Sequence, residues 1–171
     1  ADTQYQTAIE MSLGTSLQNV VTKKEDDAKR MIEYLRKNNL GRASFLPISS
    51  VRGKKIDNIK RMQGFIGIAS DLVRYNKEYE GIVLSLLGKT VIVDNMDNAI
   101  LIAKENKYSF RIVTLEGDVI NPYGSISGGS VTKKTVNILG RNEEIKKLEK
   151  EIEEIQKEIE KLSEEKQKIT N

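Results

Sequence analysis

The residues of this sequence that most readily suggest chemistry are closely spaced glycines, which often cradle phosphate groups. Gly124, Gly128 and Gly129 lie within residues 121–130, which read NPYGSISGGS. A Walker phosphate loop needs a lysine directly after its second glycine, whereas Ser130 follows Gly129 here. The stretch GFIGIAS likewise lacks the G-x-G-x-x-G spacing of a dinucleotide site. The glycines therefore do not predict nucleotide binding.

Acidic side chains are the other candidates for catalysis, because the sequence contains no histidine and no cysteine. These absences remove the commonest general base and every thiolate ligand. Carboxylates such as Asp71, Asp94, Asp97 and Asp118 have no neighbouring pattern that marks a nucleophile or a metal set. We therefore expect no catalytic residue, no metal site and no cofactor in this chain.

Two physical interpretations of the glycine cluster remain open. The alternation in SISGGS is typical of an edge strand, in which missing side chains let another backbone lie close. The alternative is a flexible connector. The side chain of Ile126 and its flanking serines favour the strand. An exposed strand edge invites strand addition, and a symmetric dimer is a natural outcome of it.

The elements that would position this cluster form a repeated strand–helix–strand pattern. Residues 5–13 predict a helix closed by Gly14, and residues 17–21 predict a short strand. A capping box at Thr22 and Glu25 then predicts the start of a helix, and a strand over RASFLPI ends at Pro47. The apolar face of that helix is expected to be buried through Ala28, Met31, Ile32 and Leu35.

The same pattern returns in the second half of the chain. Residues 89–95 predict a strand, 96–106 a helix and 108–116 a strand. GDVINPYG then suggests a hairpin that leads into the glycine cluster. We infer an α/β (mixed α+β) fold with two similar strand–helix–strand subdomains.

The last residues have a heptad pattern. Apolar residues alternate at spacings of three and four over Ile145, Leu148, Ile152, Ile155, Ile159 and Leu162, and Ile169 follows seven residues later, with Lys166 at the skipped position. Glutamates occupy every g position, at Glu144, Glu151, Glu158 and Glu165. Self-pairing would leave these glutamates without attractive partners, which favours a different partner helix that carries Lys or Arg. The simplest hypothesis is a long helix preceding Ala1 that runs antiparallel to residues 141–171. The alternative is an ordinary surface helix.

Charge is divided unevenly along the chain. Of 28 basic and 25 acidic residues, 8 and 10 lie in residues 141–171, which leaves residues 1–140 with a net charge of +5. Residues 48–63, hereafter the basic loop, carry five cations against one acidic residue, Asp57. No apolar run approaches the length of a membrane span. The expected organisation is an incoming helix over 1–14, a globular domain over 15–140 and a coiled-coil arm over 141–171.

The order of these motifs resembles the hinge domain of bacterial SMC (structural maintenance of chromosomes) proteins. The resemblance covers residues 5–140 and is carried by AIEMSLGTSLQNVV, AKRMIEYLRKNNLGRASFLPI, GFIGIASDLV, LLGKTVIVDNMDNAILIAKE and FRIVTLEGDVINPYGSISGGS. It implies a homodimer in which sheet edges pair into a ring. The implied interface residues are Gly124, Ser125, Ile126, Gly128 and Gly129, with Gly64 and Gly67 in support.

The resemblance also implies DNA binding where the hinge meets the coiled coil. The matching residues are Lys133, Lys134 and Arg141, while composition alone suggests Lys54, Lys55, Lys60 and Arg61. Such cations contact phosphates and do not read base sequence. The full-length protein is then expected to be a cytoplasmic, nucleoid-associated ATPase whose nucleotide sites lie in separate head domains. A nucleic-acid-binding module with incidental dimerisation is the alternative, and an enzyme active site in this chain is a third possibility.

Overall fold

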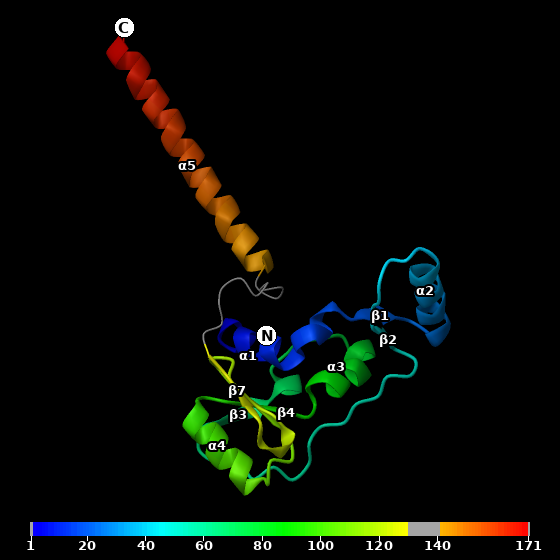
Figure 1. Cartoon of the computed structure of the whole chain (residues 1–171). Helices are drawn as coiled ribbons and strands as arrows, with labels where there is room; N and C mark the ends of the chain where they lie inside the picture. The colour runs from blue at the N-terminus through cyan, green and yellow to red at the C-terminus, as the bar shows by residue number, and fades with distance from the viewer. Residues whose placement is uncertain (1, 130–140, 171) are drawn as a thin grey trace. The chain divides into compact units, whose positions relative to one another are not determined.

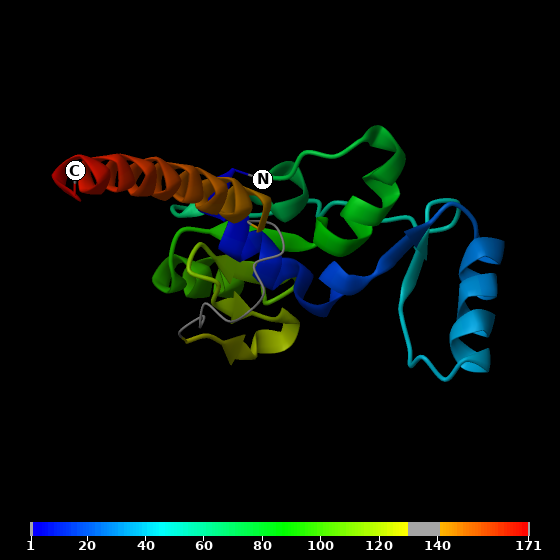
Figure 2. The same ribbon diagram turned by 90° about the horizontal axis from the view of Figure 1, so that it is seen from above.

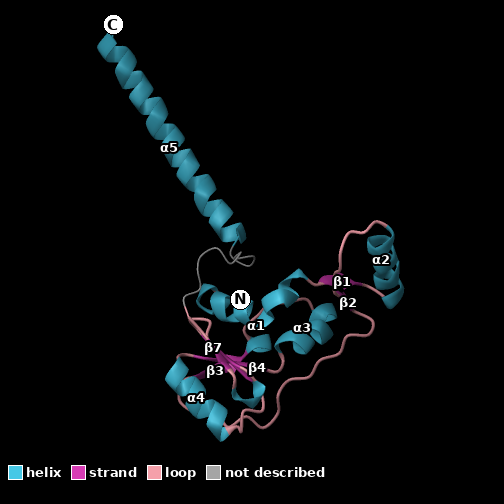
Figure 3. Cartoon of the chain, in the orientation of Figure 1, coloured by secondary structure: helices cyan, strands magenta, loops and turns pink. Residues whose placement is uncertain are grey.

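A computed structural model describes residues 2–129 and 141–170, and the side chains of 2–129 and 145–162 (Figure 1). By its internal contacts the chain divides into two units, Ala1–Thr132 and Lys133–Asn171. The first unit contains two sheets, and the second contains the helix α5 (Arg141–Thr170). Figure 3 shows the mixture of helices and strands that the sequence predicts, so the expected fold class is confirmed.

A five-stranded sheet forms the centre of the first unit. Its strands lie in the order β3 (Phe65–Ile68), β4 (Thr90–Val93), β5 (Arg111–Thr114), β6 (Val119–Ile120) and β7 (Ile126–Ser127). Only β4 and β5 run parallel, with Thr90 opposite Arg111. All four residues of β4 are buried, as is typical of a central strand covered on both faces.

Helices cover both faces of this sheet. Alternate side chains of a strand point to opposite faces, so Val91 packs against α4 (Met96–Glu105) while Ile92 packs on the other face. That second face is covered by α1 (Gln6–Leu13) and α3 (Glu80–Leu87). The sequence prediction for α1 is confirmed, because Ala8 and Ile9 are fully buried. We call this three-layer part, residues 2–18 and 64–129, the large lobe.

The first strand–helix–strand unit forms a lobe of its own, visible beside the large lobe in Figures 1 and 2. It consists of β1 (Val20–Thr22), α2 (Glu25–Lys37) and β2 (Phe45–Pro47), hereafter the small lobe, residues 20–47. β1 and β2 pair in parallel, as β4 and β5 do. The two predicted related subdomains are therefore present, but their strands belong to separate sheets.

Two predictions for α2 are wrong. The cap is not formed by Thr22 and Glu25, because the Lys24 backbone N–H donates to the Asp27 carboxylate at 3.2 Å and Thr22 Oγ1 donates to the Lys24 carbonyl. The Glu25 carboxylate instead accepts a hydrogen bond from Ser49 Oγ at 2.6 Å, which lowers the pKa of Glu25.

The predicted burial of the α2 apolar face also fails in part. Only Ala28 is buried and Leu35 is half-buried, whereas Met31 and Ile32 are 44% and 41% exposed. A sheet of two strands is too narrow to cover the apolar face of an amphipathic helix, and its stability by itself is marginal. The small lobe therefore has apolar surface that the described part of this chain leaves exposed.

Candidate functional site

The edge of the large-lobe sheet lies at β7, where the sequence predicts an interface. β7 pairs antiparallel with β6, with Ser127 opposite Val119 and Ile126 opposite Ile120. It is last in the strand order, so its outer side has no strand partner among the described residues. Ile126 and Ser127 are both exposed. This arrangement leaves backbone N–H and C=O groups available to a further strand.

A tightly held turn precedes β7. The Asn121 backbone N–H donates to the Ser125 carbonyl at 2.8 Å, and the Asn121 side-chain amide donates to Ser125 Oγ at 3.1 Å. Inside this turn Tyr123 has φ +71° and is fully exposed. The sequence analysis did not single out this tyrosine. The one feature that could have drawn attention to it is its position next to Gly124, in a motif that was considered for its glycines.

Contacts and backbone conformation within the chain explain why glycine occupies two positions of the cluster. A Cβ at Gly128 would lie 3.0 Å from Asp118 Cγ and closer still to Oδ1 of the same carboxylate. That carboxylate accepts a hydrogen bond from the Gly129 backbone N–H at 3.2 Å. Gly129 itself has φ +134° with open space around it, a conformation that favours glycine. These contacts explain the two glycines within one chain. That the glycines also make room for the backbone of a second chain stays a prediction.

The two supporting glycines lie elsewhere. Gly67 is in β3, at the opposite edge of the sheet from β7, and Gly64 directly precedes that strand. A Cβ at Gly64 would collide with Asp94 and Asn98, whereas one at Gly67 would make only ordinary contact with the Leu72 side chain. The structure therefore does not bring these positions together with the glycine cluster.

The basic loop has most of its cations engaged within the chain. The Lys55 ammonium pairs with Asp71, which raises the pKa of Lys55. Lys60 Nζ lies 3.5 Å from Glu105 Oε2. Arg61 stacks over the Phe65 ring, and Arg52 donates to three backbone carbonyls between residues 48 and 51. Among the described residues, Lys54 is the one cation of this loop whose side chain lacks such a partner.

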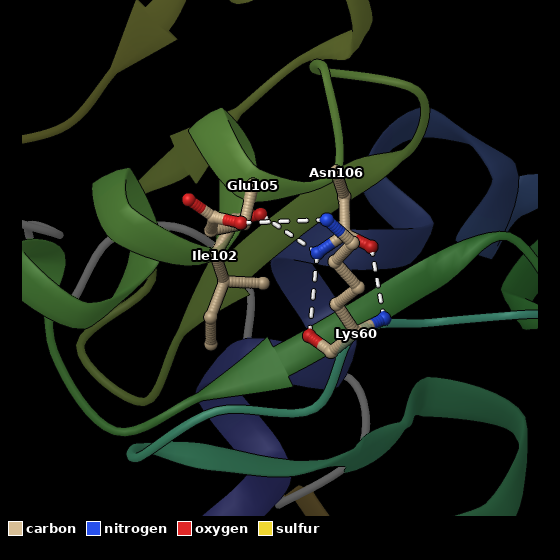
Figure 4. Close-up of polar contacts among 4 residues, drawn as sticks. All are labelled: Lys60, Ile102, Glu105 and Asn106. Atoms are coloured by element: carbon tan, nitrogen blue, oxygen red, sulfur yellow. Dashed lines mark hydrogen bonds and ion pairs between the residues drawn. The ribbon is translucent and has the colours of Figure 1, made fainter.

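Asn106, at the end of α4, fastens the basic loop to the large lobe (Figure 4). Its Oδ1 accepts a hydrogen bond from the Lys60 backbone N–H at 3.0 Å, and its Nδ2 donates to the Lys60 carbonyl at 3.3 Å and the Ile102 carbonyl at 2.8 Å. Farther back, the Ile56 N–H donates to the Gly88 carbonyl at 2.9 Å. The loop is therefore an ordered strap between the lobes.

The remaining predicted DNA contacts cannot be placed. Lys133 and Lys134 lie outside the described residues, and the side chain of Arg141, the first residue of α5, is likewise not described. Over residues 2–129 and 145–162, whose side chains the structure describes, no group of three or more acidic side chains is arranged to hold a metal ion. Within that same part of the chain, no helix has the length and apolar character needed to cross a membrane.

The heptad seam of α5 is exposed along its described length. Its apolar side chains are 45–59% exposed at Ile145, Leu148, Ile152, Ile155, Ile159 and Leu162. One ion pair on this helix joins Lys157 to Glu153, at 2.9 Å. A continuous apolar stripe that remains in water is typical of a coiled-coil strand described without its partner.

The chain is similar in sequence to known proteins. A family model described as the SMC proteins flexible hinge domain matches residues 1–103. The chain is 50% identical over 147 residues to the chromosome partition protein Smc of Clostridium kluyveri, covering 84% of this chain and 12% of that protein. It is 42% identical over 152 residues to the Smc of Bacillus subtilis, covering 86% and 13%. The chain thus spans about an eighth of the length of these relatives.

Solved structures give the same likeness. An asymmetric dimer of the Geobacillus stearothermophilus SMC hinge domain aligns with a TM-score of 0.77 at 34% identity, covering 95% of this chain and 67% of that one. The Pyrococcus furiosus Smc hinge domain with an extended coiled coil aligns with a TM-score of 0.65 at 32% identity, covering 96% and 58%. Both likenesses extend over nearly the whole chain.

Proposed function

Since this chain belongs to the family of SMC hinge domains, we propose that it forms a homodimer that joins the coiled-coil arms of a chromosome-partition SMC protein. The observation that carries the proposal is the exposed edge at β7, next to the glycine cluster, which no other described strand of this chain pairs with. The similar hinge domain of Geobacillus stearothermophilus, which was solved as a dimer, supports it.

Two incomplete surfaces on one chain support a closed ring. One is the β7 edge of the large lobe, and the other is the exposed apolar face of α2 in the small lobe. In a two-fold dimer the β7 edge of each copy meets the small lobe of the other. Both surfaces are then covered in both copies, and neither surface remains for a third copy. Edge pairing and apolar burial then hold the ring together.

The α5 seam forms a coiled coil with another arm of the same protein. Its exposed apolar stripe requires a partner, and the glutamates at its g positions favour one with basic flanks. A hinge with its arms is a mechanical element: opening or reorienting the ring admits or senses DNA. ATP hydrolysis belongs to the head domains of the full-length protein, which acts at the nucleoid in the cytoplasm, and a measurable ATPase activity of this chain would contradict that division.

DNA binding is an accessory role of the junction between the hinge and its arm. Lys133, Lys134 and Arg141 are its candidate phosphate contacts, and Lys54 is the most available cation of the basic loop. Changing Lys133 and Lys134 to glutamate weakens DNA binding and reduces the slope of log affinity against log salt by about two, one for each phosphate that is no longer neutralised. An unchanged slope would move the contact elsewhere, and Lys54→Glu would test the loop.

Sedimentation tests the proposed function directly. The chain is expected to sediment as a dimer in the absence of DNA, and to remain one at high salt because edge pairing and apolar burial are weakly screened. A monomer that binds DNA would instead support the alternative, a nucleic-acid-binding module. A monomer at micromolar concentration and low salt would refute homodimerisation.

A further inference from the structure

Tyr123 is held in an unfavourable conformation with its whole side chain in water. Its φ of +71° lies in the left-handed region, which is uncommon for a residue other than glycine, asparagine or aspartate. Its side chain is 100% exposed, so no packing against the described part of the chain compensates for the strain or the exposed ring. Backbone strain of this kind is typical of functional positions.

The backbone around Tyr123 is nevertheless rigid. Its N–H donates to the Tyr108 carbonyl at 3.1 Å, and the Gly124 N–H donates to the Asn121 carbonyl at 3.0 Å. Tyr108 is itself half-buried against the large-lobe core. The turn therefore fixes the direction in which the Tyr123 side chain leaves the backbone, which lowers the backbone entropy lost when the ring is bound.

The small lobe has an open hollow of about 300 Å³ on α2 and the chain that follows it. It is lined by Ile32, Leu35, Arg36, Gly41, Arg42 and Ala43. Ile32 and Leu35 supply an apolar base. Within residues 2–129 and the described part of α5, neither the Arg36 nor the Arg42 side chain has a hydrogen-bond or ion-pair partner, so both guanidinium groups are available to a ligand.

We propose that Tyr123 of one copy inserts into this hollow on the small lobe of a second copy. The inference rests on the homodimer proposed above and adds the residue that anchors it. An aromatic ring suits an apolar base flanked by guanidinium groups, because its faces attract cations within about 6 Å. Tyrosine and arginine are also the residue types enriched among the dominant contacts of protein interfaces.

The position of Tyr123 makes the contact reciprocal and continuous with the strand edge. It lies three residues before Ile126 at the start of β7, so a partner that meets this edge also meets the ring. In a two-fold dimer each copy supplies one tyrosine and one hollow, so both hollows are filled. The second copy is favoured over an unrelated protein because the chain itself carries both halves of the contact.

The first test replaces Tyr123 with asparagine, which tolerates the left-handed backbone and keeps the turn intact. Truncating a dominant interface residue weakens binding by roughly thirtyfold or more, so removing the ring from both copies is expected to raise the dimer Kd by about a thousandfold. Sedimentation over a dilution series measures the change. Tyr123→Phe retains the ring and is expected to keep the dimer, and Leu101→Ala, at another exposed apolar position, is the matched control.

Complementation provides a second test. Ile32→Glu places a charge in the hollow, so this variant and Tyr123→Asn each form weak homodimers with no intact tyrosine–hollow pair. Their mixture forms heterodimers that retain one intact pair. Native mass spectrometry is expected to show a ratio of heterodimers to homodimers about thirtyfold above its statistical value.

The outcomes separate this inference from the homodimer itself. A monomeric wild-type chain would refute the homodimer and the anchor together. A wild-type dimer that Tyr123→Asn leaves unchanged, or a mixture with only statistical heterodimers, would overturn the anchor and leave the homodimer standing. Circular dichroism of each variant shows whether its fold is intact.

Discussion

Substitutions at Gly128 can separate two effects of an added side chain: a clash with Asp118 in the same copy and a clash with the backbone of a second copy. In Gly128→Ala the new Cβ displaces the Asp118 side chain, whose carboxylate accepts from the Gly129 N–H at 3.2 Å and from Thr114 Oγ1 at 3.4 Å. Losing two hydrogen bonds of about 1 kcal/mol each destabilises the monomer by about 2 kcal/mol. The Tm is then expected to fall by about 4–8 °C.

The double variant Gly128→Ala with Asp118→Ala removes that internal clash. The nearest remaining atom of residue 118 is then its Cβ, 3.3 Å away, a tight contact that a shift of a few tenths of an ångström relieves, so the double variant should be close to Asp118→Ala in stability. If the glycine also clears a partner backbone, overpacking of about 1–3 kcal/mol in each copy persists. The dimer Kd of the double variant should therefore exceed that of Asp118→Ala by at least about thirtyfold.

Thermal melts and sedimentation of four proteins complete this test: the wild type, both single variants and the double variant. Equal dimer affinity for the double variant and Asp118→Ala would refute the clearance argument at Gly128. The glycine would then serve only the packing of Asp118 within its own chain. The β7 edge could still pair, but the absence of a side chain at this position would not explain how.

Three further predictions concern the basic loop. Asn106→Leu removes three hydrogen bonds at a buried position and is expected to lower the free energy of unfolding by about 2–4 kcal/mol, with faster hydrogen exchange at the Lys60 amide. Gly53→Ala should destabilise the chain by at least about 1 kcal/mol, because its Cβ would overlap the α3 backbone, and trypsin cleavage at the loop reports the loosening. Asp71→Asn should cost no more than about 1 kcal/mol at neutral pH, as for other exposed ion pairs. The pKa of Lys55 is raised by this pair, so the pair stabilises the fold while Lys55 is charged, and the difference between variant and wild type should vanish at strongly alkaline pH.

Local patterns in the sequence predict most of the elements correctly. The apolar spacing of α1, the strand–helix–strand pattern of β4, α4 and β5, and the end of β2 at Pro47 all agree with the structure. These signals work because each depends on residues a few positions apart. Helix periodicity, strand alternation and proline termination are properties of the local chain.

The errors have a common cause. α2 has the amphipathic pattern of a buried helix, yet Met31 and Ile32 are exposed because the sheet beneath it has only two strands. The cations of the basic loop look available in the sequence, yet most meet carboxylates, carbonyls or a ring that the fold brings to them. Periodicity identifies an apolar face, but it cannot reveal how much surface there is to cover it.

Residue order alone was therefore enough to establish the elements, the family resemblance and the heptad seam, since these depend on residue types met one after another. The folded chain was needed to establish that β7 is a sheet edge, that Asp118 fills the space at Gly128, and that Tyr123 is exposed on a rigid turn. Such facts depend on residues that approach one another after the chain has folded. Asn106 and Lys60, which are 46 positions apart, illustrate this, because no local pattern encodes their contact.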